Sequence, residues 1–302
     1  MSQDLLEYIS NRKKELKAII MAHYYQPPEI QDAADFIGDS LQLARQASET
    51  DAEVIIFCGV KFMAESAKIL SPEKTVILPE INAGCPMADM ITAAALREMK
   101  SRHPGAVVVC YVNSSAEVKA ESGICCTSSN AINVVKSIPQ DKEIIFVPDK
   151  NLGTHIQDQT GRKMILWEGF CPVHNLLTRE ELKEQLALHP GAKVVVHPEC
   201  IPDITRSSDA VRSTAGILNY VQASPEKDFI IGTEEGFTYT LENNCPEKNF
   251  YLARLDFQCR DMKYISLSSL ARSMEKLQYR IELPEETREK AHNALQKMLS
   301  IN

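Results

Sequence analysis

The chain has 302 residues, of which 44% are hydrophobic and 25% charged, a composition that excludes an intrinsically disordered or collagen-like chain. Its 33 Lys and Arg residues against 41 Asp and Glu leave a net charge of −8, which argues against a general nucleic-acid-binding protein. The length predicts two or three packed domains, because a single hydrophobic core stops growing at about 250–300 residues.

The sequence carries no signal for membrane insertion or export. No apolar run approaches the roughly 18 residues of a membrane span. Residues 1–17 are polar and amphipathic, without the apolar core of a signal peptide. We therefore expect a cytoplasmic protein that contacts neither membrane nor nucleic acid. In a reducing compartment the nine cysteines are more consistent with metal ligands, catalytic groups or buried thiols than with disulfides.

An internal repeat organises the chain. The string His-Pro-Gly-Ala occurs at residues 103–106 and again 86 positions later at 189–192, each time after a helical pattern and before a short apolar run. In the first third of the chain, an amphipathic pattern over residues 5–16 precedes the equivalent run. The runs that open the three copies are residues 18–23, 107–111 and 193–197.

Two further apolar runs follow in each copy and keep the same phase. The second runs are residues 54–57, 144–147 and 229–231, and the third are residues 75–78, 163–166 and 250–252. Short apolar runs that alternate with helical patterns are typical of parallel strands joined by crossover helices. The sequence therefore predicts the α/β class: three homologous doubly wound α/β domains with parallel sheets arranged around a pseudo-threefold axis.

The repeat also sets the predicted domain boundaries. The first repeat covers residues 1–84, the second 85–170 and the third 171–281. A terminal helix within residues 282–302 is expected to pack on the first repeat. The alternative, that any α/β chain is weakly self-similar, is disfavoured because polar residues with functional chemistry recur in the same phase.

Polar side chains lie at the end of the first apolar run of each copy. They are His23 and Tyr25 in the first copy, Tyr111 and Asn113 in the second, and His197 and Glu199 in the third. The binding crevice of parallel α/β units lies at the carboxyl ends of the strands. Three units around a threefold axis would direct all of these groups into one central cavity, which favours a functional site over isolated structural residues.

A hydroxyl residue opens a later helical stretch in each copy: Ser40, Ser128 and Thr214. One role for these hydroxyls is N-capping, worth about 1 kcal/mol each. The other is capture of an anion, because a helix N-terminus offers unpaired N–H groups and the positive end of the helix dipole. The two roles can coexist, and the second suits an acidic protein that binds a small polyanion.

One cysteine in each copy follows the third apolar run at the start of a helical stretch: Cys85, Cys171 and Cys259. That position favours the thiolate, so we expect lowered thiol pKa values there. None of the three belongs to a Cys-x-x-Cys pair, so a zinc ribbon or ferredoxin-type cluster is not encoded locally. Three thiolates on a threefold axis can hold a [4Fe–4S] cluster with one iron not ligated by protein, which would act as a Lewis acid. A three-cysteine zinc site is the competing prediction.

Seven strings, in order along the chain, resemble the quinolinate synthase family. They are His-Tyr-Tyr-Gln (23–26), Gly-Asp-Ser (38–40), Tyr-Val-Asn (111–113), Cys-Thr-Ser (126–128), Gly-Phe-Cys-Pro-Val-His (169–174), His-Pro-Glu-Cys (197–200) and Ser-Thr-Ala-Gly (213–216). The resemblance implies three homologous α/β domains around one [4Fe–4S] cluster, in agreement with the repeat. It also implies condensation of iminosuccinate (iminoaspartate) with dihydroxyacetone phosphate to form quinolinate, an early step of NAD biosynthesis.

The resemblance also assigns residues. Cys85, Cys171 and Cys259 would ligate the cluster, and the substrate pocket would be lined by His23, Ser40, Tyr111, Asn113, Ser128, His197, Glu199 and Thr214. His197 and Glu199 are the expected proton-transfer groups, and Tyr25 and Tyr111 the expected donors to developing oxyanions. A transient contact with the enzyme that supplies the unstable imine is a further expectation.

One departure from the family concerns the third cysteine. Some members place it within a Cys-x-x-Cys-x-x-Cys run, whereas this chain continues from Cys259 to Met262 without another cysteine, and Cys245 is the sole fallback. Two other functions stay open: an iron–sulfur hydro-lyase acting on another small dicarboxylate, and a non-catalytic cluster-based redox sensor. The convergent His, Tyr, Asn and Glu residues favour an enzyme over a sensor.

Overall fold

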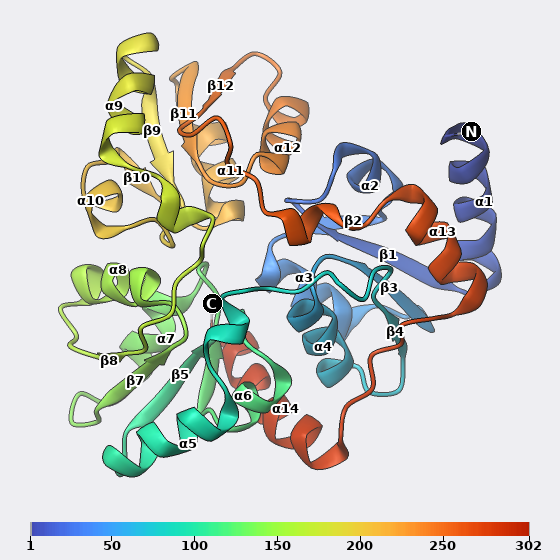
Figure 1. The fold of residues 1–302 in the computed structure, drawn as a ribbon, viewed down its shortest axis with the longest axis horizontal. Helices are drawn as coiled ribbons and strands as arrows, with labels where there is room; N and C mark the ends of the chain where they lie inside the picture. The colour runs from blue at the N-terminus through green and yellow to red at the C-terminus, as the bar shows by residue number, and fades with distance from the viewer. Residues whose placement is uncertain (1, 302) are drawn as a thin grey trace.

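The structure, a computed structural model, describes residues 2–301. Met1 and Asn302, the outer ends of the predicted first repeat and terminal helix, lie outside the described residues. Within residues 2–301 the strands form three separate four-stranded parallel sheets, one for each predicted repeat (Figure 1). The prediction of three α/β units with parallel sheets is confirmed.

The first unit contains the sheet of order β2-β1-β3-β4. Its strands are β1 (Ala18–His23), β2 (Phe36–Gly38), β3 (Val54–Cys58) and β4 (Thr75–Ile77). Its helices are α1 (Ser2–Glu15), α2 (Pro28–Ala33), α3 (Ser40–Glu49) and α4 (Lys61–Leu70). The central strand β1 pairs in parallel with β2 and β3, so its carboxyl end lies in the middle of one sheet edge.

The second unit repeats this order as β6-β5-β7-β8. Its strands are β5 (Val107–Tyr111), β6 (Ile124–Cys126), β7 (Ile144–Val147) and β8 (Ile165–Leu166). The short 3-10 helix η1 (Ala88–Met90) precedes its helices, which are α5 (Ala93–Arg102), α6 (Ala116–Ala120), α7 (Ala131–Ser137) and α8 (Lys150–Thr160). Strand β5 holds the central position that β1 holds in the first unit.

The third unit has the order β10-β9-β11-β12. Its strands are β9 (Lys193–Val196), β10 (Ala210–Val211), β11 (Asp228–Gly232) and β12 (Asn249–Leu252). The 3-10 helix η2 (His174–Leu176) precedes helices α9 (Arg179–Leu188), α10 (Pro202–Thr205), α11 (Thr214–Ala223) and α12 (Gly236–Asn244). The chain continues through the 3-10 helix η3 (Arg260–Lys263) into α13 (Leu267–Lys276) and α14 (Glu285–Leu299).

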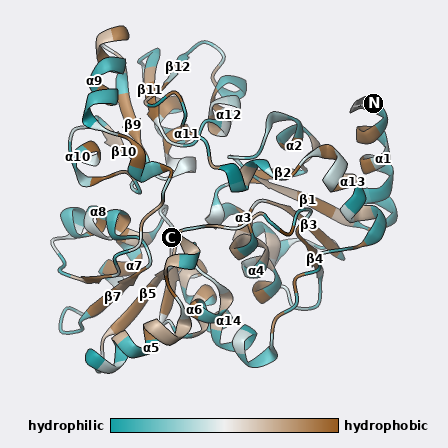
Figure 2. Ribbon diagram, viewed as in Figure 1, coloured by the Kyte–Doolittle hydropathy of each residue, from teal (hydrophilic) through white to brown (hydrophobic). Residues whose placement is uncertain are grey.

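Burial of the strands explains why short apolar runs predicted them correctly. Every residue of β3 and of β7 is buried, as expected of parallel strands covered by helices on both faces. Figure 2 shows hydrophobic colour concentrated on the strands and hydrophilic colour on the outer helices. The repeated His-Pro-Gly-Ala string is a turn between a helix and a strand, in which Gly105 and Gly191 have φ values of 89° and 90°. Glycine adopts this left-handed backbone without steric cost, so the string recurs for a conformational reason.

The end of the chain returns from the third unit to the other two. Helix α13, which the predicted boundaries place in the third repeat, packs against α1 of the first unit (Figure 1). Helix α14 contacts α4 of the first unit, on which the terminal helix was expected to pack, and also packs against α6 and β6 of the second. Its buried face includes Ala291, Leu295 and Met298. The terminal helix therefore joins two units, and the predicted domain boundaries stay a prediction.

Among the helices described between residues 2 and 301, none combines the length and the apolar character that a membrane crossing requires.

Candidate functional site

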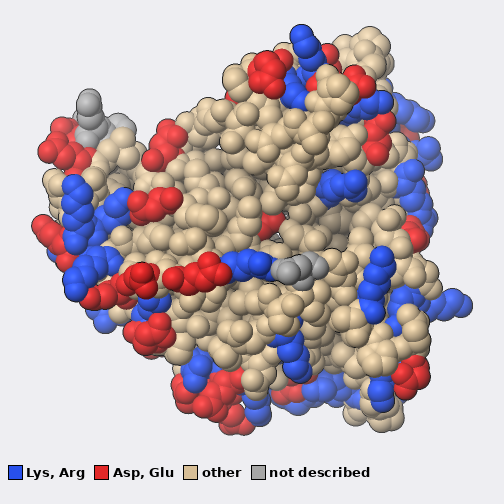
Figure 3. All heavy atoms as spheres, turned by 180° about the vertical axis from the view of Figure 1, so that it is seen from behind, with Lys and Arg blue, Asp and Glu red and all other residues tan. Residues whose placement is uncertain are grey.

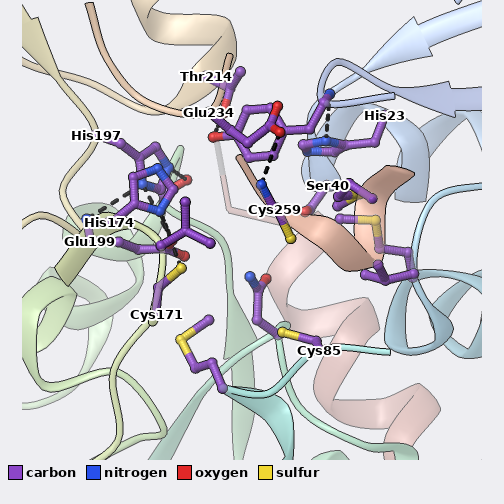
Figure 4. Close-up of a pocket in the computed structure, with 18 of the residues that line it drawn as sticks. His23, Ser40, Cys85, Cys171, His174, His197, Glu199, Thr214, Glu234 and Cys259 are labelled. Carbon is purple, nitrogen blue, oxygen red and sulfur yellow. Dashed lines mark hydrogen bonds and ion pairs between the residues drawn. The ribbon is translucent and has the colours of Figure 1, made fainter. Parts of the chain in front are cut away.

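All three units contribute to one cavity. Figure 4 shows Cys171, His174, His197 and Glu199 on one side of this space and His23 and Ser40 on the other. The structure brings together all twelve residues that the sequence analysis singled out, since each of them lines this cavity: His23, Tyr25, Ser40, Cys85, Tyr111, Asn113, Ser128, Cys171, His197, Glu199, Thr214 and Cys259.

The fold positions these side chains because equivalent central strands end at the cavity. His23 is the last residue of β1 and Tyr111 the last residue of β5, while His197 directly follows β9. All three are buried. Carboxyl ends of parallel strands form the binding edge of an α/β sheet, and three such edges meet here.

The three hydroxyls lie at the cavity, but at two of the helices the preceding residue provides the cap. Helix α3 begins at Ser40 with Asp39 as its N-cap, and α11 begins at Thr214 with Ser213 as its N-cap. The Asp39 and Ser213 side chains accept the backbone N–H bonds of the first turns. The hydroxyls of Ser40 and Thr214 therefore do not cap these helices, which leaves them for another role. Ser128 precedes α7 by three positions, and its Oγ lies 3.2 Å from His197 Nε2.

Glu199 is an acid of the cavity that is only 3% exposed and has two side-chain donors. The Tyr111 hydroxyl donates to Oε1 over 2.7 Å. Nδ1 of His174 lies 2.7 Å from Oε2 and 3.2 Å from the sulfur of Cys171, so its proton faces both acceptors. His174 was missed as a site residue, although it ends the Gly-Phe-Cys-Pro-Val-His string three positions after Cys171.

A chain of hydroxyls extends this network across the cavity. Thr233 Oγ1 lies 2.9 Å from His174 Nε2 and 2.6 Å from the Tyr25 hydroxyl, which is 3.1 Å from Thr214 Oγ1. Because His174 donates from Nδ1 to Glu199, its Nε2 must accept from Thr233 in the neutral ring. The consistent donor direction then runs from Thr214 through Tyr25, Thr233 and His174 to the carboxylate. Thr233 was also missed, and its position directly after β11 was the available signal.

The pKa of Glu199 reflects opposing effects. Burial by itself would raise this pKa, but the neighbouring His197 and His174 and the hydrogen bonds from His174 and Tyr111 outweigh burial and lower it. Burial keeps His197 neutral at neutral pH, and the contacts of the carboxylate with His174 and Tyr111 remain there. Glu199 is therefore a carboxylate at neutral pH, held at the end of a directed hydrogen-bond chain.

His23 and His197 are buried as neutral rings. The backbone N–H of Tyr25 donates to His23 Nδ1 over 3.1 Å, and that of Glu199 donates to His197 Nδ1 over 3.4 Å. Each ring therefore carries its proton on Nε2. Burial, the largest effect, lowers the pKa of both histidines to about 3, although the Glu199 carboxylate opposes it. The Nε2–H of His197 is left to donate to Ser128 or to a bound ligand.

The three cysteines occupy equivalent positions. Cys85, Cys171 and Cys259 each precede a short 3-10 helix, and none forms a disulfide. The expected lowering of their pKa values is wrong for the chain by itself: burial raises the pKa of all three thiols, that of Cys259 to about 11. Nearby backbone N–H groups, such as that of Ala88 beside Cys85, oppose burial but do not overcome it.

Acidic side chains fix the backbone around each cysteine. Asp149 Oδ2 accepts from the Cys171 N–H over 3.2 Å, and Glu234 Oε1 accepts from the Cys259 N–H over 3.0 Å. Asp261 Oδ1 accepts from the N–H of Gly84, next to Cys85, over 3.1 Å. Lys263 lies 2.9 Å from Glu234 Oε1, so the Cys259 segment is tied to the end of β11 by an ion pair.

The donor set fits a metal group that binds thiolates. Three sulfurs line one cavity, and they are close enough that Cys259 raises the pKa of Cys85 and of Cys171. Backbone N–H groups face these sulfurs, as is favourable for thiolates, and a metal would deprotonate thiols that burial otherwise keeps neutral. Cys171, His174 and Glu199 also place donor atoms within 4.8 Å of one another, which could hold a single ion. The other six cysteines are buried, and none of them is among the residues found to line the cavity.

Comparisons with known proteins agree on one family. The family model described as quinolinate synthetase A protein matches residues 7–300. A quinolinate synthase of Desulforudis audaxviator is 50% identical over 100% of this chain and 99% of its own length. Quinolinate synthase 1 of Methanosarcina acetivorans is 50% identical over 99% and 98%, and a quinolinate synthase of Clostridium perfringens is 52% identical over 98% of each chain.

The two neutral buried histidines predict a loss of stability toward acid. In the unfolded chain each titrates near pH 6.5, whereas in the fold the pKa is about 3. Between these values the unfolded chain binds more protons, so the free energy of unfolding falls as the pH falls. From pH 7.5 to pH 6.0 we expect each histidine to contribute a loss of about 0.8 kcal/mol, measured by urea unfolding of anaerobically prepared protein.

The variant His23→Gln keeps an acceptor for the Tyr25 N–H and should reduce this loss by the share of one histidine. His292→Gln, which changes a partly exposed residue of α14, is the matched control and should behave as the parent. An unchanged pH dependence in His23→Gln would contradict the account.

Proposed function

The chain belongs to the quinolinate synthetase A family, and from this premise we propose that it condenses iminosuccinate with dihydroxyacetone phosphate to form quinolinate, with release of phosphate and water. The observation that carries the proposal is the convergence of three cysteines and the Glu199 network on one cavity. The proposed place of this reaction is early NAD biosynthesis in the cytoplasm.

Cys85, Cys171 and Cys259 are the residues proposed to hold a [4Fe–4S] cluster in which one iron has no protein ligand. When bound, such a cluster supplies a Lewis acid that can polarise a carbonyl or hydroxyl oxygen. Such a cluster would also cross-link the three sheets, since one of these cysteines follows the last strand of each sheet: β4, β8 and β12.

Glu199 is the proposed general base for proton removal during condensation. Its carboxylate is ionised at neutral pH and lies beside two donors, Tyr111 and His174, that can hold it in one orientation. A proton taken up by Glu199 could pass along the hydrogen-bond chain, because each member of the chain can exchange its donor and acceptor roles. Tyr111 and Tyr25 remain protonated because burial raises the pKa of each hydroxyl, so both can donate to oxygen atoms that gain negative charge.

The substrate carboxylates are proposed to bind at Ser40, Ser128 and Thr214. Two of these hydroxyls open α3 and α11, helices of ten residues whose N-terminal N–H groups favour an anion. Figure 3 shows Lys and Arg interspersed with Asp and Glu over the face it presents, so attraction of the anion falls to local groups. Asn113 Oδ1 is buried without a hydrogen-bond partner among the described residues, and it would accept an N–H of the imine.

The imine is unstable, and its hydrolysis in bulk water competes with its transfer between enzymes. A transient contact with the enzyme that supplies the imine is therefore part of the proposal.

A hydro-lyase acting on another dicarboxylate would use the same donor set. Quinolinate formed from the two named substrates under anaerobic conditions supports the condensation, and its absence from a protein with full iron content rejects it.

The variant Cys259→Ala is expected to lose most of the bound iron and sulfide, because a cluster would retain only two protein ligands. Iron and sulfide are measured on anaerobically reconstituted protein. Cys245→Ala removes the other cysteine of this region, which is buried, and should keep the full content. Full iron in Cys259→Ala, or lost iron in Cys245→Ala, would contradict the assigned ligand set.

The variant Glu199→Gln is expected to keep its iron and to lose about 10²–10⁴-fold in kcat, the usual contribution of general acid–base catalysis. The amide preserves the shape of the side chain but cannot take up the proton. Glu226→Gln, an exposed position outside the cavity, is the control. Turnover by Glu199→Gln close to that of the control would reject Glu199 as the base.

His174 is expected to set the acid limb of the pH–rate profile through Glu199. His174→Gln can reach Thr233 but loses the Nδ1 donor, so the pKa of Glu199 should rise and the acid limb should move up by about one pH unit. His174→Asn can retain a donor near the Nδ1 position and should leave the limb nearer its original pH. The idea fails if both variants change kcat equally without moving the profile.

A further inference from the structure

A chain of polar side chains links the three units at the rim of the cavity. The Ser129 hydroxyl lies 2.6 Å from Asp39 Oδ2 and 2.8 Å from the hydroxyl of Ser213. Asp39 belongs to the first unit, Ser129 to the second and Ser213 to the third.

The Ser129 hydroxyl makes both contacts of this chain as the donor. Asp39 can only accept in its ionised form, and Ser213 Oγ also accepts from the Gly216 N–H over 3.2 Å. The single proton of Ser129 can be donated to Asp39 Oδ2 or to Ser213 Oγ. The chain therefore bridges α11 and α3 through one hydroxyl.

Helix capping does not account for Ser129. Asp39 Oδ1 already accepts both N–H bonds of its helix, from Leu41 and Gln42, so Oδ2 is left for the contact with Ser129. The Ser129 hydroxyl bonds no group of its own unit in the described network, and the N-cap position of α7 belongs to Asn130. The bridge thus helps to hold the three units in position relative to one another.

Each member of the bridge is the chain neighbour of a cavity hydroxyl. Asp39 precedes Ser40, Ser129 follows Ser128, and Ser213 precedes Thr214. The three hydroxyls come from separate units, so their mutual distances depend on how the units are held together. A displacement of one unit by a fraction of an ångström would change a three-point contact with a ligand.

We propose that Ser129 is a positioning residue, whose bonds to Asp39 and Ser213 set the spacing of Ser40, Ser128 and Thr214 for a dicarboxylate ligand. The ligand's identity rests on the proposed function, whereas the bridge itself does not. Ser129 is exposed at the rim, so its removal leaves no cavity in a core and the chain should fold.

The kinetic test compares Ser129→Ala with Ser129→Thr. Loss of the hydroxyl in Ser129→Ala should raise the KM for the imine about three- to tenfold, which is the effect expected of one weakened hydrogen bond. The kcat should change by less than about twofold, and the iron content should stay unchanged. Threonine keeps the hydroxyl and should restore the KM of the parent. Thr92→Ala removes the N-cap of α5, away from the cavity, and should leave the KM unchanged. An unchanged KM in Ser129→Ala, or a raised KM that threonine does not restore, would overturn the proposal.

A second measurement is independent of catalysis. In urea unfolding of the reconstituted protein, Ser129→Ala and Ser213→Ala together should destabilise less than the sum of the two single changes, because either one breaks the same bridge. Strict additivity would overturn the bridge even if quinolinate is formed. Coupling in a protein that forms no quinolinate would instead refute the proposed reaction and leave the bridge standing.

Discussion

The convergence of three sheet edges is the constraint on which the rest of the structure depends. Each unit ends its central strand at the same cavity, so His23, Tyr111 and His197 line one space only because the units are packed around that point. Single α/β units of this size could not enclose such a space. The chemistry is therefore divided among thirds of the chain, and the interfaces between units belong to the site.

Burial then decides how the convergent groups behave. Two histidines become neutral donors, while Glu199 stays ionised because two neighbours donate to it. The same burial keeps the cysteines protonated until a metal displaces their protons. Acid, base and metal donors thus keep distinct protonation states within one small volume, and no lysine or arginine is among the described residues that line it.

Much of this arrangement could be predicted from the sequence, because a repeated pattern of strands and strand-end residues is local information. The threefold phase located Cys85, Cys171 and Cys259 without knowledge of their distances. His174 and Glu234 were not predicted, since Glu199, the acceptor of His174, and Lys263, the ion-pair partner of Glu234, lie about 25 to 29 positions further along the chain. Ser40 and Thr214 were considered as N-caps, but the caps are the preceding residues, Asp39 and Ser213. The sequence did not separate these neighbours, because both members of each pair suit a helix start. The packing of α13 against α1 could not be predicted, since an amphipathic pattern shows that one face of a helix is buried but not which element buries that face.

The central claim is that thiolates from three equivalent units hold one [4Fe–4S] cluster with a single iron open to ligands. Mössbauer spectroscopy of protein reconstituted with isotopically enriched iron tests it most directly, before and after addition of quinolinate. The account predicts a cluster spectrum in which one iron in four changes when quinolinate is added, while the other three keep the parameters of sulfur-ligated iron. A spectrum of isolated iron ions, or a cluster whose four irons all remain unchanged, would contradict it.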